Sequence, residues 1–115
     1  MMAVLLPAYF HDASMEAVAP MFDGTTFRAQ AMVRGFEVLA SWSSVDRLAS
    51  ITVPTLVLAG RHDVFTSHPQ SRRIASRIAD AELVVFEHSG HFPWIEEPER
   101  FDSVVGDWLD RATPD

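Results

Sequence analysis

Two short apolar runs most constrain what this chain can fold into. Residues 55–60 read Thr-Leu-Val-Leu-Ala-Gly and residues 83–86 read Leu-Val-Val-Phe. Continuous runs of this kind, rich in β-branched and aliphatic residues, are typical of buried parallel strands rather than half-exposed ones. An amphipathic helical pattern follows each run, over residues 69–79 and 98–112, with Pro98 near the start of the second. The sequence therefore predicts a β-α-β-α unit of the α/β class.

The first fifty residues show helical spacing instead. Ser14 is a candidate cap for a short helix through Phe22, the apolar positions from Thr26 predict a helix to about Ala40, and Ser44 begins a further turn through Ala49. We accordingly divide the chain into residues 1–50 and 51–115. Because two strands this apolar make a poor sheet alone, we expect the outer edge of residues 55–59 to be unpaired or paired with another chain.

The composition disfavours several function classes. A length of 115 residues, 48% of them hydrophobic and 22% charged, suits one globular domain. A formal charge of −7 would repel a phosphate backbone, so we expect no nucleic-acid partner. Cysteine is absent, which removes thiolate catalysis and fits a reducing compartment. The apolar start, Met1 to Pro7, has no basic residues and is too short to span a bilayer, so we expect no membrane association and a cytoplasmic location.

An acid and a histidine follow the two predicted strands. Asp63 lies just after the first strand, and His91 lies 28 positions later in the loop after the second. The carboxyl ends of adjacent parallel strands share one edge of a sheet, which is where open α/β sheets place their ligands. A carboxylate that orients an imidazole is the arrangement of general-base catalysis. The nucleophile is missing, because no Gly-x-Ser-x-Gly occurs in the 115 residues.

Other residues near these loops admit plainer interpretations. Phe65, Phe92 and Trp94 are candidates for a pocket mouth, although aromatic residues near loops as often serve packing. His88 and His91 have a chelating spacing only on a helix, and here they fall in a predicted loop from His88 to Glu97, so we expect no metal. We assign no chemistry to His62. Neither Ser67 nor Ser89 has the strained elbow that a nucleophile needs, and the run Glu96-Glu97-Pro98-Glu99 is interpreted as the acidic start of the last helix.

Two longer motifs carry a family resemblance. Residues 53–63 read Val-Pro-Thr-Leu-Val-Leu-Ala-Gly-Arg-His-Asp, and residues 89–101 read Ser-Gly-His-Phe-Pro-Trp-Ile-Glu-Glu-Pro-Glu-Arg-Phe. Together they resemble the carboxyl-terminal end of an α/β-hydrolase, most closely of the proline-iminopeptidase-like hydrolases. The resemblance implies that residues 1–50 correspond to the end of the helical cap and the return to the core, and that residues 51–115 are the carboxyl-terminal part of the core.

The resemblance also implies roles for two residues. Asp63 takes the place of the triad acid and His91 that of the triad base, whereas the serine and the oxyanion loop would precede residue 1. No cofactor is implied. Proline iminopeptidases are expected to hold the substrate's amino group with acidic side chains, but Val64 follows the acid and Glu37 is the only acid in the predicted 26–40 helix. Related members act as esterases, lactonases, carbon-carbon bond hydrolases or haloperoxidases, and some use an aspartate nucleophile.

Two functional hypotheses follow. In the first, the chain supplies Asp63 and His91 to a nucleophile encoded upstream or on another chain, for hydrolysis of an ester, amide or related acyl bond in a small molecule or peptide. In the second, it is a non-catalytic module that binds itself or a partner through its exposed sheet edge. An expected hydrogen bond of about 3.2 Å or less between Asp63 and His91 belongs to the first hypothesis.

Overall fold

The computed structural model describes residues 8–12, 18, 21, 23–26 and 28–113. Its centre is a two-stranded parallel sheet, formed by β1 (Thr55–Gly60) and β2 (Ala81–Phe86). The register pairs Thr55 with Ala81 and Gly60 with Phe86, so the two strands end side by side. The β-α-β-α unit predicted from the sequence is therefore present, with β2 beginning two residues earlier than expected.

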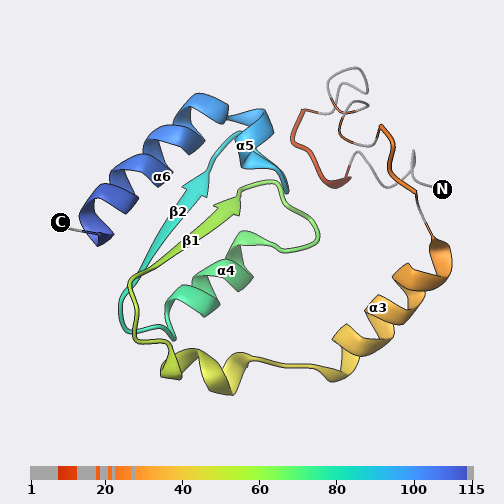
Figure 1. The fold of residues 1–115 in the computed structure, drawn as a ribbon, viewed down its shortest axis with the longest axis horizontal. Helices are drawn as coiled ribbons and strands as arrows, with labels where there is room; N and C mark the ends of the chain where they lie inside the picture. Colours follow the sequence, from red (N-terminus) through yellow and green to blue (C-terminus); the bar gives the residue numbers. More distant parts are fainter. Residues whose placement is uncertain (1–7, 13–17, 19–20, 22, 27, 114–115) are drawn as a thin grey trace.

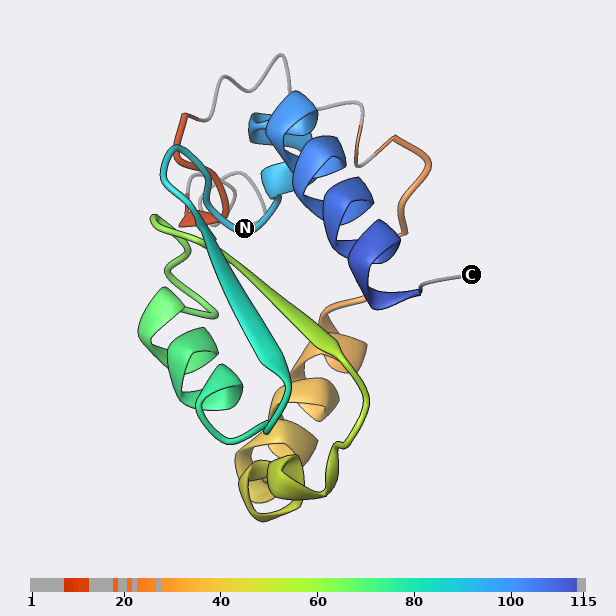
Figure 2. The ribbon, with the colours of Figure 1, turned by 90° about the vertical axis from the view of Figure 1, so that its left-hand side faces the viewer.

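Helices cover the two faces of this sheet. Helix α4 (His68–Ala75) connects the strands and packs on one face, while α6 (Pro98–Ala112) lies on the other, as Figure 2 shows. Partly buried apolar side chains of α6 include those of Phe101, Val104, Val105 and Trp108, and the ring of Phe101 lies 6.1 Å from the fully buried Phe86 ring. Phe86, Ala59 and Ile78 are the buried apolar residues of this part.

The structure differs from the sequence prediction in the end of one helix and in the content of one loop. The helix predicted over residues 69–79 stops at Ala75, because the chain then makes tighter turns in which Arg77 N donates to Ile74 O and Ile78 N to Ala75 O. These turns carry Ile78 into the core at 6% exposure. The segment 88–97, expected to be a loop, contains the one-turn helix α5 (Pro93–Glu96), for which Pro93 supplies a preset backbone angle at the first position.

The amino-terminal helices lie apart from the sheet. Helix α3 (Ala29–Ser41) and the 3₁₀ helix η3 (Val45–Ser50) confirm the expected helices of this region approximately, and α3 stands away from the strands in Figure 1. Its apolar stripe is exposed, with Val33, Phe36 and Leu39 at 57–59%. Within the described residues no side chain of α3 is buried against another element. The helix expected from Ser14 to Phe22 lies, apart from residues 18 and 21, outside them.

The outer edge of β1 is open, as expected. Thr55 N donates to Asp80 O and Arg61 N to Phe86 O, so the odd-numbered residues of β1 direct their peptide groups towards β2. By the alternation of a parallel ladder, Leu56 and Leu58 direct theirs to the opposite edge. In the described part of the chain no strand pairs there. Among these same residues, no helix is both long and apolar enough to cross a bilayer.

Candidate active site

The two predicted site residues meet at the carboxyl ends of the strands. Asp63 lies three residues after β1 and is only 8% exposed, whereas His91 lies five residues after β2 with its side chain one-third exposed. Nδ1 of His91 is 2.8 Å from Oδ2 of Asp63. The hydrogen bond expected from the sequence is therefore present, formed by loops 28 residues apart.

This bond settles which imidazole nitrogen is available for chemistry. With Nδ1–H donating to the carboxylate, the lone pair of the neutral ring resides on Nε2. A buried carboxylate behind Nδ1 also stabilises the imidazolium that forms when Nε2 takes a proton. The pair can thus act as an oriented general base, with Nε2 as the accepting atom.

Asp63 is held by its own loop as well as by His91. Oδ1 accepts hydrogen bonds from the backbone N–H groups of Phe65 and Thr66, both at 2.9 Å, and Oδ2 accepts one from the Thr66 hydroxyl at 2.5 Å. Burial on its own would raise the pKa of Asp63, but the hydrogen bonds from Thr66, His91 and Phe65 outweigh it and lower the pKa below its ordinary value. The acid therefore stays ionised at neutral pH.

Sequence reasoning missed Thr66. Its hydroxyl touches both members of the pair, because Oγ1 is also 3.3 Å from Nδ1 of His91. The missed signal is the spacing Asp-x-x-Thr, in which an aspartate commonly accepts hydrogen bonds from the backbone two and three residues later.

The histidine loop is held by a glutamate that the sequence analysis interpreted otherwise. Oε2 of Glu97 accepts hydrogen bonds from the backbone N–H of His88 at 3.0 Å and from the hydroxyl of Ser89 at 2.6 Å. Arg100 donates to Oε1 at 3.2 Å. Burial opposes the charged form of Glu97, yet these hydrogen bonds, led by Ser89, lower its pKa overall.

The interpretation of residues 96–99 as the acidic start of the last helix is confirmed for Glu97, at the N-cap position of α6, and for Glu99, in its first turn, but is wrong for Glu96. Glu97 does precede α6, but its side chain makes no cap hydrogen bond to that helix. Glu96 ends α5 and accepts a hydrogen bond from the backbone N–H of Gly90 at 2.7 Å. Both carboxylates accept hydrogen bonds from the loop that carries His91 and so satisfy backbone N–H groups of that loop.

An ion pair joins the two loops next to the dyad. Arg61 directly follows β1 and Glu87 directly follows β2, and their side chains form two hydrogen bonds of 2.8 and 2.6 Å. The hydrogen bonds from Arg61 lower the pKa of Glu87, and the same contacts raise the pKa of Arg61. Both side chains are well exposed, so the pair aligns the loops more than it stabilises the fold.

Of the three aromatic candidates, two lie at the dyad. The ring of Phe92 meets the His91 ring edge-on at 5.0 Å, and Phe65, 44% exposed, stacks on Tyr9 at 4.2 Å. Trp94 is one step removed, 49% exposed and edge-on to Phe92 at 5.3 Å. Tyr9, which sequence reasoning did not single out, also meets the His91 ring at 5.3 Å. Nothing local in the sequence marks Tyr9, because the contact spans more than eighty residues.

Of the two serines near the dyad, Ser89 makes a structural hydrogen bond through its hydroxyl. Ser89 is fully buried and its hydroxyl donates to Glu97, and Ser67 precedes the first residue of α4. His62 directs Nε2 to the backbone oxygen of Glu87 at 3.1 Å. Within the ranges that the structure describes, no three His, Cys, Asp or Glu side chains gather closely enough to hold a metal ion.

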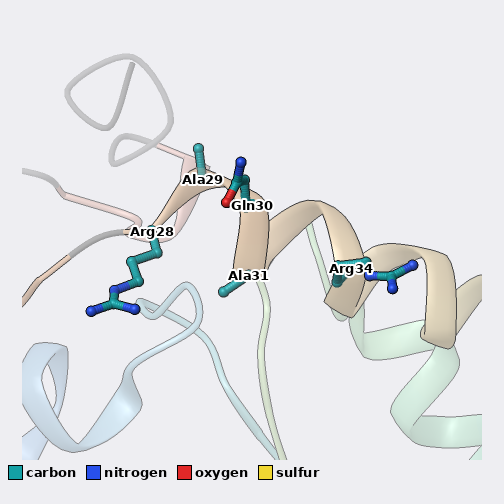
Figure 3. Close-up of a pocket in the computed structure, with 5 residues that line it drawn as sticks. All are labelled: Arg28, Ala29, Gln30, Ala31 and Arg34. Carbon is teal, nitrogen blue, oxygen red and sulfur yellow. The ribbon is translucent and has the colours of Figure 1, made fainter.

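A hollow elsewhere on the chain is unrelated to the dyad. It has a volume of about 480 Å³, lies at the amino end of α3 and is lined by Arg28, Ala29, Gln30, Ala31 and Arg34. Figure 3 shows that the side chains of Arg28 and Arg34 point in different directions rather than converging. The hollow therefore offers no clustered charge to a ligand.

The fold agrees with comparisons to known proteins. Residues 2–104 match the family model described as Alpha/beta hydrolase family, and the chain belongs to that family, corresponding to the carboxyl-terminal portion of its fold. A relative is the proline iminopeptidase of Saccharolobus solfataricus, 32% identical over 74 residues, which cover 64% of this chain and 24% of that protein. The resemblance to proline iminopeptidases inferred from the sequence is thus confirmed.

Solved structures show the same fold. An esterase from Exiguobacterium antarcticum superposes on 90% of this chain and 39% of its own, with a TM-score of 0.79 at 24% identity, which shows the fold alone. Est816, described as an N-acyl homoserine lactone degrading enzyme, covers 58% of this chain and 26% of its own, with a TM-score of 0.56 at 39% identity. The chain spans about a quarter to a third of the length of the first curated relatives that it matches.

Proposed function

We propose that this chain supplies the acid and the base of a Ser-His-Asp triad for hydrolysis of an ester, amide or related acyl bond. The observation that carries the proposal is the 2.8 Å hydrogen bond between Nδ1 of His91 and the carboxylate of Asp63, which is buried and accepts further hydrogen bonds from its own loop. Membership of the hydrolase family supports it, as do similar proteins described as a proline iminopeptidase and as a lactone-degrading enzyme.

In this mechanism a hydroxyl outside these 115 residues attacks the carbonyl carbon of the substrate. Its proton passes to Nε2 of His91 while the new bond to carbon forms. Asp63 stays ionised and stabilises the imidazolium through Nδ1–H. The same proton then passes from Nε2 to the leaving oxygen or nitrogen as the bond to carbon breaks, and water repeats the cycle to release the acid product.

The first experiment asks whether the chain needs a nucleophile from elsewhere. We expect the purified, folded 115-residue chain to turn over p-nitrophenyl acetate no faster than its His91→Ala variant. Turnover that disappears in His91→Ala would place a nucleophile within these residues and contradict the proposal. Circular dichroism of both proteins establishes that the comparison is between folded samples.

A chimera gives the positive test. The part of the Saccharolobus solfataricus proline iminopeptidase that precedes its matched segment is joined to this chain, and turnover is measured with p-nitrophenyl acetate and with proline p-nitroanilide. We expect hydrolysis that falls by at least about a thousandfold in both Asp63→Ala and His91→Ala. Activity in a folded chimera that is indifferent to His91 would refute the assignment. The ratio of the two substrates separates an esterase from a peptidase.

The open sheet edge favours a second candidate, a non-catalytic module that self-associates. The outward peptide groups of Leu56 and Leu58 and the exposed stripe of α3 are surfaces that a second copy could cover. Light scattering after size exclusion would then show a dimer that Leu56→Pro abolishes, because that proline removes an outward N–H and no bond to β2. A monomeric wild-type chain would rule this candidate out.

A further inference from the structure

A five-residue segment lies across both loops of the dyad. We call residues 8–12 the strap; Figure 1 shows it in red, beside α5 and the ends of the strands. On the acid side, the ring of Tyr9 stacks on Phe65 at 4.2 Å, and the ring of His11 stacks on His62 at 3.7 Å. The strap therefore covers the loop of Asp63 at two points.

The strap also holds the loop of the base. The backbone N–H of His91 donates to the backbone carbonyl oxygen of Tyr9 at 2.5 Å. Gly90 is essential to this approach, because a Cβ on it would overlap the Tyr9 oxygen and lie 2.8 Å from Cα of Phe10. The backbone of the strap thus lies directly on the residue before His91.

The carboxylate of Glu96 connects the strap to the loop that carries His91. Oε1 of Glu96 accepts a hydrogen bond from the backbone N–H of His11 at 2.5 Å, and Oε2 accepts one from the N–H of Gly90 at 2.7 Å. A second strap N–H, that of Asp12, lies 3.4 Å from Oε1. Hydrogen bonds to an ionised acceptor are roughly twice as strong as neutral ones, and here one side chain ties two segments of the backbone together.

We propose that Glu96 is a positioning residue for the dyad. By binding both the N–H of Gly90 and the strap, whose Tyr9 oxygen accepts from the N–H of His91, it sets the direction in which the imidazole leaves the loop and holds Nδ1 against Asp63. Glu96 touches neither the dyad side chains nor a reacting atom, so it acts through the backbone alone. The inference rests on the proposed function, since the orientation of His91 matters for catalysis only if His91 is the base.

The test compares Glu96→Gln with Glu99→Gln in the intact 115-residue chain. Glutamine has the shape of glutamate but presents an N–H₂ donor to one of the N–H groups, so one of the two bonds must be lost. Glu99 is exposed, lies in the first turn of α6 and undergoes the identical change. It therefore controls for the loss of a negative charge near the same helix.

Nuclear magnetic resonance reads the result without an activity assay. In Glu96→Gln we expect the amides of Gly90 and His91 to exchange about tenfold faster or more, and the low-field Nδ1–H resonance of His91 to broaden or vanish. Glu99→Gln should leave both unchanged. A folded Glu96→Gln chain with the wild-type Nδ1–H resonance and unchanged exchange would overturn the proposal.

Two further measurements test the positioning role if Glu96→Gln does not fold and separate it from the proposed function. If Glu96→Gln does not fold, Glu96→Asp retains the charge but is one methylene too short to bridge both N–H groups, and an unchanged His91 resonance there refutes the positioning role equally. In a chimera that carries Glu96→Gln, the Nδ1–H resonance of His91 could be lost while hydrolysis is undiminished. That result would refute the proposed function and leave the positioning role standing. The two failures are therefore distinguishable.

Discussion

Replacing Gly60 by alanine should separate the two dyad loops. A Cβ on Gly60 would lie 2.5 Å from the oxygen of Ser89 and 2.7 Å from the carbonyl carbon of Gly90, and it would overlap the oxygen of Gly90. Ordinary contacts begin at 3.4 Å, so the histidine loop has to move by about 1 Å or more. These atoms are backbone, and no side-chain rotation can relieve the overlap.

The consequence is a loss of both stability and dyad geometry. Overpacking of this kind costs about 1–3 kcal/mol. A 1 Å shift of the loop also takes the 2.8 Å bond between Asp63 and His91 beyond hydrogen-bonding range, and the loss of a bond to a charged group costs about 1.5–3 kcal/mol. Because the two losses share one displacement, we expect a total nearer the larger than the sum.

Gly106→Ala is the matched control. It makes the same substitution inside α6, where a Cβ would meet no atom within 4 Å, and alanine is favoured over glycine there by up to about 1 kcal/mol. Urea denaturation of the wild type and both variants gives the free energies of unfolding, and the Nδ1–H resonance of His91 reports the dyad. Equal stability of the two variants together with an intact resonance in Gly60→Ala would refute the reasoning.

Two further predictions concern the charged groups of the site. Glu97→Gln should lower the free energy of unfolding by about 1.5–3 kcal/mol at pH 7, because Glu97 is a charged acceptor for two donors of the histidine loop. Folding lowers the pKa of Glu97, so its carboxylate contributes fully to the free energy of unfolding above the pKa of an unfolded glutamate, about 4.3. This contribution is lost as the pH falls through the lower pKa of the folded state. Urea curves of wild type and variant that stay equally far apart on acidification would contradict this. Thr66→Val removes the hydroxyl that donates to Asp63, so the pKa of the Asp63 carboxyl should rise towards its ordinary value in a ¹³C titration, while Thr66→Ser should retain the wild-type value. Identical Asp63 titrations in the valine and serine variants would show that the Thr66 hydroxyl does not contribute to this pKa.

The local pattern of the sequence predicted the two strands and the positions of the dyad residues after them. Continuous apolar runs predicted both strands, and the residues immediately after them placed Asp63 and His91 at a shared edge, because parallel strands linked by a helix end on the same side. The ends of the segments were predicted less well. Helix α4 stops at Ala75, and the turns that follow bury Ile78 in the core, which the periodicity of the sequence does not encode.

What holds the dyad was decided only by the tertiary structure. The carboxylate of Glu97 has the same sequence signature as a helix-start acid, yet it binds the histidine loop because that loop folds back over it. Glu96 bonds to His11 across 85 residues, and Tyr9 reaches His91 across a similar span. Gly60 and Gly90 are indistinguishable from other turn glycines until the backbones that press on them are in place. Sequence thus determined which residues follow each strand, through local preferences of the backbone, whereas close approach of distant segments determined how those residues are held.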